Sequence, residues 1–237
     1  MSKIDQDKNG TAVSFYRIKT VIEKSRNQNS NLIVAVTGSI ACGKSTVSRM
    51  LEDLGALLID FDRIAREVVM PGTPGYDRIV ADFGATVVQS DGALDRKALS
   101  DIVFADETKR RHLEQITHPL IFETFARKLT RMMADHPDTI IQVAVPLLIE
   151  LNMQHLFDKV IVVYLPEEIQ IDRLAARENI SAEAAKAIIG SQLSPDEKKQ
   201  YADYVIDNRH DRAHTQDQVN RVWQRLQQDK KTAESGY

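Results

Sequence analysis

The chain has 237 residues, of which 43% are hydrophobic and 27% are charged, and its formal net charge is −3. This length allows one sizeable core with an inserted subdomain. The slightly acidic balance excludes a general attraction to nucleic acid or anionic membranes, and no apolar run is long enough to span a bilayer. A single cysteine excludes an internal disulfide framework. We expect a cytoplasmic protein.

Residues 1–30 differ in character from the rest of the chain, and we expect a polar N-terminal extension. The ends of this segment are rich in Asn, Ser and Lys, which is typical of tails and linkers. Between them, Phe15, Ile18 and Ile22 have helical spacing. One short helix within residues 12–24 is therefore predicted.

Short apolar runs rich in Val and Ile recur along the chain from residue 32 onwards. They are continuous rather than alternating, which is typical of parallel strands buried on both faces. Helical patterns at 46–54 and 167–178 come after two of these runs. This order predicts an α/β fold, a doubly wound parallel sheet of five strands. The expected strands are 32–36, 56–60, 139–145, 159–165 and 204–208.

The spacing of the strands breaks once. Between the second and third runs lie residues too numerous for one crossover, and their patterns are largely helical. We interpret residues 63–138 as a helical insertion that forms a substrate lobe. The core is then formed by 31–62 and 139–237, with a helical lid at about 167–200.

The first strand leads directly into a phosphate-binding motif. Residues Gly38 to Ser45 match G-x-x-x-x-G-K-[ST] between a predicted strand and a predicted helix. Glycines allow the backbone N–H groups to surround a phosphate, and the helix N-terminus adds positive partial charge. Lys44 would meet the outer phosphates and the Ser45 hydroxyl would bind Mg²⁺. The predicted nucleotide-binding residues here are Gly38, Ser39, Ile40, Ala41, Cys42, Gly43, Lys44, Ser45 and Thr46.

Cys42 has a separate interest because it lies within this loop. Beside Lys44 and a helix N-terminus, its thiol is expected to have a lowered pKa and to react readily with alkylating agents if accessible. Bound ATP should then shield it.

Other motifs do not point to a different class. A GTPase would carry N-K-x-D, which is absent, and D-x-x-G after the P-loop, where none is found. The tripeptide Asp82-Phe83-Gly84 lacks the H-R-D loop of a protein kinase and is interpreted as a turn. His210 and His214 have no companion ligands for zinc nearby and are interpreted as surface residues. A small-molecule kinase remains.

The second strand ends in acidic residues, where open α/β sheets bind ligands. A kinase that phosphorylates a hydroxyl benefits from a carboxylate that accepts its proton. Asp60 and Asp62 are two apart, and in extended chain they would project to the same side. Asp62 is the predicted catalytic base, although it could also cap the helix expected at 63–70.

After the fourth strand, Gln170, Arg173 and Arg177 share one face of a predicted helix. By themselves such residues would favour a solvated face. In a P-loop kinase, arginines here would close over the phosphates and stabilise the transferred group.

From about Leu32 to Asp211, the chain resembles the dephospho-CoA kinase family. The likeness rests on VTGSIACGKST, LIDFDRIAREVV, THPLIF, VPLLIE, the Q-x-x-R-x-x-x-R segment and ADYVIDN. The resemblance implies that Asp62 is the catalytic base, that Arg173 and Arg177 belong to the lid, and that Asn208 lies in the loop near the adenine of ATP. It also places the binding of dephospho-CoA at Asp60, Arg66, His118 and Pro119.

The chain departs from the family pattern in the P-loop, which usually reads G-G-I-G-S-G-K-[ST]. Here Ser39, Ala41 and Cys42 stand at the second, fourth and fifth places. If Ala41 must adopt a positive φ, its methyl group adds roughly 1 kcal/mol of strain. The arginine that often precedes the lid-associated I-x-x-Q is replaced by Ile188.

We therefore expect a kinase that uses ATP and Mg²⁺ to phosphorylate the 3′-hydroxyl of dephospho-CoA, the last step of coenzyme A synthesis. Its partner would be that small molecule, with no nucleic acid or membrane, and the protein would be a monomer or a weak homo-oligomer. One alternative is a P-loop kinase for a nucleoside, nucleotide or sugar. Another is a nucleotide-binding regulator that has lost turnover.

Overall fold

The computed structural model describes residues 20, 22 and 30–235. The chain divides into two compact units. The helical unit consists of Met1–Glu23 and Phe61–Arg131, and the sheet unit consists of Lys24–Asp60 and Met132–Tyr237. Within the described residues, no helix is long and apolar enough to cross a membrane.

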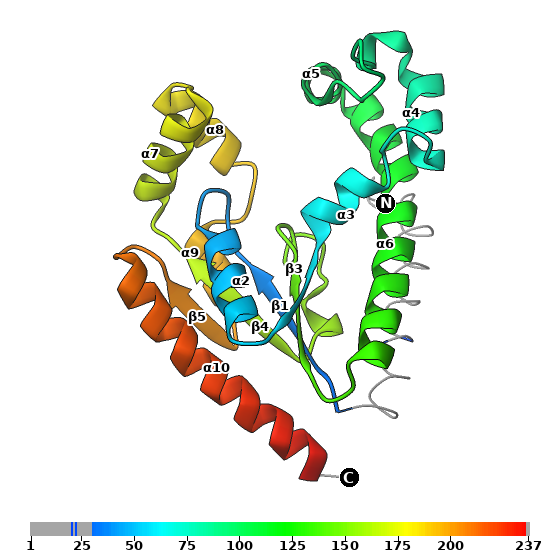
Figure 1. Cartoon of the computed structure of the whole chain (residues 1–237). Helices are drawn as coiled ribbons and strands as arrows, with labels where there is room; N and C mark the ends of the chain where they lie inside the picture. The colour runs from blue at the N-terminus through cyan, green and yellow to red at the C-terminus, as the bar shows by residue number, and fades with distance from the viewer. Residues whose placement is uncertain (1–19, 21, 23–29, 236–237) are drawn as a thin grey trace, which may run out of the picture. The chain divides into compact units, whose positions relative to one another are not determined.

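The sheet unit is built on five parallel strands, as predicted. Their order is β2-β3-β1-β4-β5, so β1 lies at the centre and the crossovers place helices on the sheet (Figure 1). The fold class is therefore confirmed, and each strand lies within two residues of its predicted limits. The strands are β1 (Leu32–Thr37), β2 (Leu57–Asp60), β3 (Ile140–Ala144), β4 (Lys159–Tyr164) and β5 (Tyr204–Asp207).

The core of this unit explains why the strands read as continuous apolar runs. Val34 and Val36 of β1 pack with Met50 of α2 (Lys44–Asp53) and Val222 of α10 (Arg212–Ser235). The alternate residues of β1 face the other side of the sheet and are also buried. Both faces of the central strand are thus removed from water, which leaves no exposed position for a polar residue.

The lid region contains three helices. These are α7 (Glu167–Glu178), α8 (Ala182–Ile189) and α9 (Pro195–Lys199). The first has the limits that its periodicity predicts. The last begins with a capping box, in which Ser194 and Glu197 exchange side-chain-to-backbone hydrogen bonds.

The helical unit packs around aromatic residues. The ring of Phe61 lies 4.9 Å from that of Phe125 and 6.2 Å from that of Phe122. A further tie joins Lys128 to Glu67, 2.7 Å apart. The helices of this unit are α3 (Phe61–Glu67), α4 (Pro74–Phe83), α5 (Arg96–Ala105) and α6 (Glu107–Asp135). The last turn of α6, after Arg131, belongs to the sheet unit.

Two sequence predictions concern this unit. Asp82 and Phe83 are the last two residues of α4 and Gly84 is its C-cap, with a φ of 82°, so the tripeptide ends a helix and is not the turn that was expected. The helix predicted within 12–24 lies mostly outside the described residues. Of it, Thr20 and Ile22 are helical, and Ile22 is buried.

The edge strand β5 is fastened to α10 by a tyrosine. The Tyr204 hydroxyl donates to a carboxylate oxygen of Asp229 at 2.5 Å, and Lys159 of β4 lies 3.6 Å from the same carboxylate oxygen. Burial, and then the hydrogen bond to Asp229, raise the pKa of Tyr204 to about 12.

We predict that Tyr204→Phe lowers the free energy of unfolding by about 0.5–1.5 kcal/mol, because it removes this hydrogen bond. The raised pKa means that the unfolded chain loses its phenolic proton first. The contribution of Tyr204 to the free energy of unfolding should therefore be fully present below about pH 10 and should fall as the pH rises towards about 12. Urea unfolding of both proteins at pH 7 and pH 11 measures this, and a variant as stable as the wild type at pH 7 would show that Tyr204 does not fasten α10.

Candidate functional site

The P-loop joins the carboxyl end of β1 to the start of α2. Helix α2 begins at Lys44, and its N-cap residue Gly43 has a φ of 92°. No described side chain caps this helix. The start of α2 therefore presents the positive partial charge of a helix N-terminus, which is the arrangement that phosphate sites use.

Two glycines are required by close neighbours. A Cβ on Gly38 would lie 2.5 Å from the carbonyl oxygen of Val163, and a Cβ on Gly43 would lie 2.1 Å from Nδ2 of Asn208. Real Cβ atoms do not approach other atoms so closely. Any other residue at either position would displace β4 or Asn208 from the loop.

Ala41 adopts the left-handed conformation, with a φ of 61°. Strain was expected at this position only if φ were positive, and the structure shows that φ is positive. Ile40 and Ala41 both pack against a buried apolar cluster in the predicted lid, which consists of Leu174, Ala185 and Ile189. The tip of the P-loop and the lid are therefore in contact.

Asn208 braces the loop from the other side. Its Nδ2 donates to the Cys42 carbonyl at 2.8 Å, and its Oδ1 accepts from the Thr215 hydroxyl at 2.8 Å. Its main-chain amide donates to the Tyr164 carbonyl at 2.9 Å. Since the residue is buried, these bonds satisfy its amide and hold the P-loop between β4 and α10.

Cys42 corrects one prediction. Its side chain is buried beneath the loop rather than presented to solvent. Burial raises the pKa of the thiol to about 11, and this effect exceeds the lowering by the Lys44 amide and by the charges of Lys44 and Lys198. The expectation of a lowered pKa was wrong because it considered the helix N-terminus and the lysine but not desolvation.

The lid residues on α7 have distinct positions. Gln170 is buried and donates from Nε2 to the Leu165 carbonyl at 2.6 Å, so it ties α7 to the end of β4. Arg173 donates to the Asn208 carbonyl at 3.3 Å, which places its guanidinium beside the residue that braces the P-loop. Arg177 is exposed and lies 2.8 Å from Glu178.

Asp60 and Asp62 do not lie in one extended segment. Asp60 ends β2, whereas α3 begins at Phe61 and contains Asp62 in its first turn. The geometric part of that prediction was wrong because the helix starts two residues earlier than expected. Asp60 belongs to the sheet unit, and its strand ends at the same edge of the sheet as β1.

The remaining predicted substrate residues lie in the helical unit. Arg66 is exposed in the last turn of α3. His118 and Pro119 lie within the long helix α6, and the His118 ring lies 6.1 Å from the ring of Phe122. His118 is half-buried and Pro119 is exposed.

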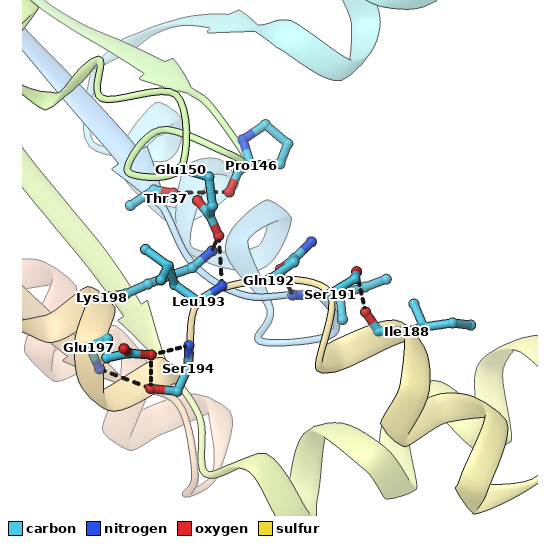
Figure 2. A network of polar contacts seen from close by, with 11 residues as sticks. Thr37, Pro146, Glu150, Ile188, Ser191, Gln192, Leu193, Ser194, Glu197 and Lys198 are labelled. Carbon is cyan, nitrogen blue, oxygen red and sulfur yellow. Dashed lines mark hydrogen bonds and ion pairs between the residues drawn. The ribbon is translucent and has the colours of Figure 1, made fainter. Parts of the chain in front are cut away.

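Between α8 and α9, within the predicted lid region, lies a polar junction that the sequence did not predict (Figure 2). Lys198 is fully buried and lies 2.8 Å from an oxygen of Glu150, in the loop after β3. The same oxygen accepts from the Leu193 amide at 3.1 Å. Gln192 accepts from the amide of Ile40 in the P-loop at 3.2 Å. The segment after α8 is thus attached to two loops at the carboxyl edge of the sheet.

Comparison with known proteins agrees with this architecture. The family model described as dephospho-CoA kinase matches residues 32–216. The chain is 43% identical over 195 residues to the dephospho-CoA kinase of Syntrophus aciditrophicus (strain SB), covering 82% of this chain and 83% of that protein. It is 44% identical over 192 residues to that of Geobacter metallireducens, covering 81% and 95%. The chain belongs to the dephospho-CoA kinase family.

A solved structure gives the same result. The dephospho-CoA kinase from Campylobacter jejuni aligns with a TM-score of 0.64 at 31% identity, over 84% of this chain and 98% of that one. The fold of the protein is therefore that of its family, and it is an enzyme of the P-loop kinase class. ATP is the phosphoryl donor that a kinase of this family implies.

The junction of Glu150, Gln192 and Lys198 left weak signals in the sequence. Glu150 ends VPLLIE and Gln192 ends the I-x-x-Q segment, and both segments formed part of the family pattern. Nothing in the sequence shows that Lys198 is buried, because lysine in a charged helix such as α9 is usually exposed.

The rings of His210 and His214 lie edge to face, with their centroids 4.7 Å apart. No group of three metal-binding side chains occurs among the described residues.

We predict that the native protein reacts slowly with iodoacetamide at pH 8, with or without ATP, because Cys42 is buried and its pKa is raised to about 11. Unfolding in guanidinium should increase the rate of labelling by at least about tenfold. Mass spectrometry of timed samples measures both rates. Rapid labelling of the native protein that ATP suppresses would contradict the buried position.

Proposed function

We propose that the protein transfers the terminal phosphoryl group of ATP to the 3′-hydroxyl of dephospho-CoA and thereby completes the synthesis of coenzyme A. The observation that carries this proposal is a complete P-loop that leads into α2, a helix whose N-terminus has no side-chain cap. The dephospho-CoA kinase family model matches residues 32–216 of the same chain. A bond forms between the acceptor oxygen and the γ-phosphorus, the bond from that phosphorus to the bridging oxygen breaks, and ADP leaves.

The residues of the sheet unit would bind the nucleotide. The loop 38–46 would surround the phosphates, Lys44 would meet the charge on the outer ones, and Asn208 supports the loop through the Cys42 carbonyl. The loop that begins at Asn208 is proposed to border the adenine. Arg173 and Arg177, on α7, would stabilise the charge that develops on the transferred group.

Mg²⁺ fits the start of α2. The Ser45 residue is exposed there, and a hard oxygen donor such as its hydroxyl is the ligand type that Mg²⁺ accepts. Among the described residues no set of three acidic, His or Cys side chains forms a metal cage, which suits an ion held by one hydroxyl and the phosphates. When bound, Mg²⁺ would neutralise phosphate charge.

Asp62 would orient the acceptor hydroxyl and accept its proton. It comes two residues after the carboxyl end of β2 in the chain, and it is exposed in the first turn of α3. Asp60, Arg66, His118 and Pro119 are proposed to contact dephospho-CoA. We also infer a cytoplasmic protein, a monomer or weak homo-oligomer without nucleic-acid or membrane partners, because its charge is near neutral and it has one cysteine.

We predict that dephospho-CoA accepts phosphate from labelled ATP at a rate at least about a hundredfold above that with adenosine, AMP, gluconate or shikimate. Lys44→Ala should nearly abolish this transfer and leave the melting temperature within a few degrees, because the lysine meets charge on the outer phosphates. Transfer to one of the other acceptors instead would identify a different small-molecule kinase. Tight ATP binding with no transfer to any of them would identify a regulator.

We predict that Asp62→Asn lowers kcat with dephospho-CoA by about 10²–10⁴-fold, the usual range for loss of a positioned base, and barely changes the KM for ATP. The matched control is Asp77→Asn, which alters an exposed aspartate in the first turn of another helix, α4. The control should keep kcat within about twofold, since it lies in no proposed site. If both variants retain wild-type kcat, Asp62 is not the base.

A further inference from the structure

The tip of the P-loop is packed into the lid. Leu174 of α7 and Ala185 and Ile189 of α8 form a buried apolar cluster, and Ile40 and Ala41 pack against it. Within the described part of the chain, the other partly buried residues that pack on this cluster come from 171–180, in or just after α7. Any movement of the lid helices therefore changes the surroundings of the phosphate-binding loop.

One hydrogen bond connects the same two elements. Gln192 comes three residues after the end of α8, and its Oε1 accepts from the Ile40 amide at 3.2 Å (Figure 2). Ile40 precedes Gly43, the N-cap of α2, by three residues. The bond therefore occupies an amide at the tip of the loop rather than one at the start of the helix.

The main chain next to Gln192 is fixed independently of the apolar cluster. The Leu193 amide donates to Glu150 at 3.1 Å, and the same carboxylate oxygen lies 2.8 Å from the buried Lys198. Separating a buried lysine from its carboxylate leaves an uncompensated charge, which is strongly destabilising. This ion pair therefore gives the Gln192 side chain a rigid base.

We propose that Gln192 is a positioning residue for phosphoryl transfer. Through the Ile40 amide it holds the tip of the P-loop against the lid cluster, and so keeps the phosphate-binding amides in register with Arg173 on α7. The loss of one such hydrogen bond from the transition state corresponds to roughly 2- to 13-fold in rate. The proposal rests on the phosphoryl transfer proposed above.

The first test is Gln192→Met, which keeps the length of the side chain and removes the acceptor. We expect kcat with dephospho-CoA to fall about 3- to 10-fold while the KM for ATP changes less than about twofold, because ATP still meets the amides of α2. The control is Gln216→Met. The Gln216 side chain donates to Asn220 on α10 at 3.0 Å, and this variant should retain wild-type kcat.

The second test asks whether Gln192 acts through the tip of the loop. Ile40→Ala removes the packing of the tip on the lid cluster, and a double mutant with Gln192→Met completes the cycle. If both residues hold one junction, the combined loss in kcat should be clearly smaller than the product of the separate losses. Losses that multiply would show two independent effects and overturn the proposal, as would an unchanged kcat in Gln192→Met.

Amide hydrogen exchange provides a readout that does not depend on turnover. In Gln192→Met the Ile40 amide loses its acceptor, so exchange in the peptide 36–46 should accelerate several-fold while the melting temperature changes little. Unchanged exchange at Ile40 would overturn the proposal even if kcat fell. Failure of dephospho-CoA as an acceptor would instead overturn the proposed function, and would not alter the exchange result.

Discussion

The structure depends on one demand placed on the backbone of 38–46. This segment must turn its amides towards an anion and still be enclosed tightly enough to keep that conformation without a ligand. The enclosure is provided by Val163 of β4 against Gly38 and by Asn208 against Gly43. A loop held in this way needs no reorganisation when phosphate binds, which is how preorganised amides stabilise charge. The glycines are therefore required by the packing of their neighbours as much as by the ligand.

Several buried polar residues of the sheet unit hold the P-loop and the neighbouring chain in place. The buried side chains of Asn208 and Thr215 lie next to the loop. Thr215 donates to Oδ1 of Asn208, which orients Nδ2 of Asn208 towards the Cys42 carbonyl. Lys198 and Glu150 form a buried ion pair on the lid side. Such a pair gives weak stabilisation compared with apolar packing, so its value here lies in fixing the path of the chain between α8 and α9. Apolar residues alone would not specify that path so closely.

The P-loop of this chain also shows how a departure from the family pattern can be accommodated. Ala41 adopts a conformation that favours glycine. Its methyl group packs against the lid cluster, and this apolar contact offsets part of the strain. The buried Cys42 fills the space beneath the loop, and its pKa is raised to about 11. Ala41 and Cys42 are thus both used in apolar packing.

The five strands, the helix at 167–178 and the P-loop could be predicted from the amino-acid order alone, because each depends on a local pattern. A strand buried on both faces must be apolar throughout, and a phosphate loop needs its glycines and lysine at fixed spacing. Other features emerged only when the chain was folded. The ion pair of Lys198 with Glu150 joins residues 48 positions apart, and the bond of Asn208 to Cys42 joins residues 166 positions apart.

No local pattern encodes contacts of that range, and the burial of Cys42 depends on them. The residue at which α3 begins also depends on contacts between residues far apart in the chain. Phe61 packs on Phe122 and Phe125 of α6, and this distant contact favours a helix that begins at Phe61, two residues before the predicted start. Patterns of spacing and polarity therefore determined which elements form, whereas packing between distant residues determined where α3 begins and which polar groups are buried.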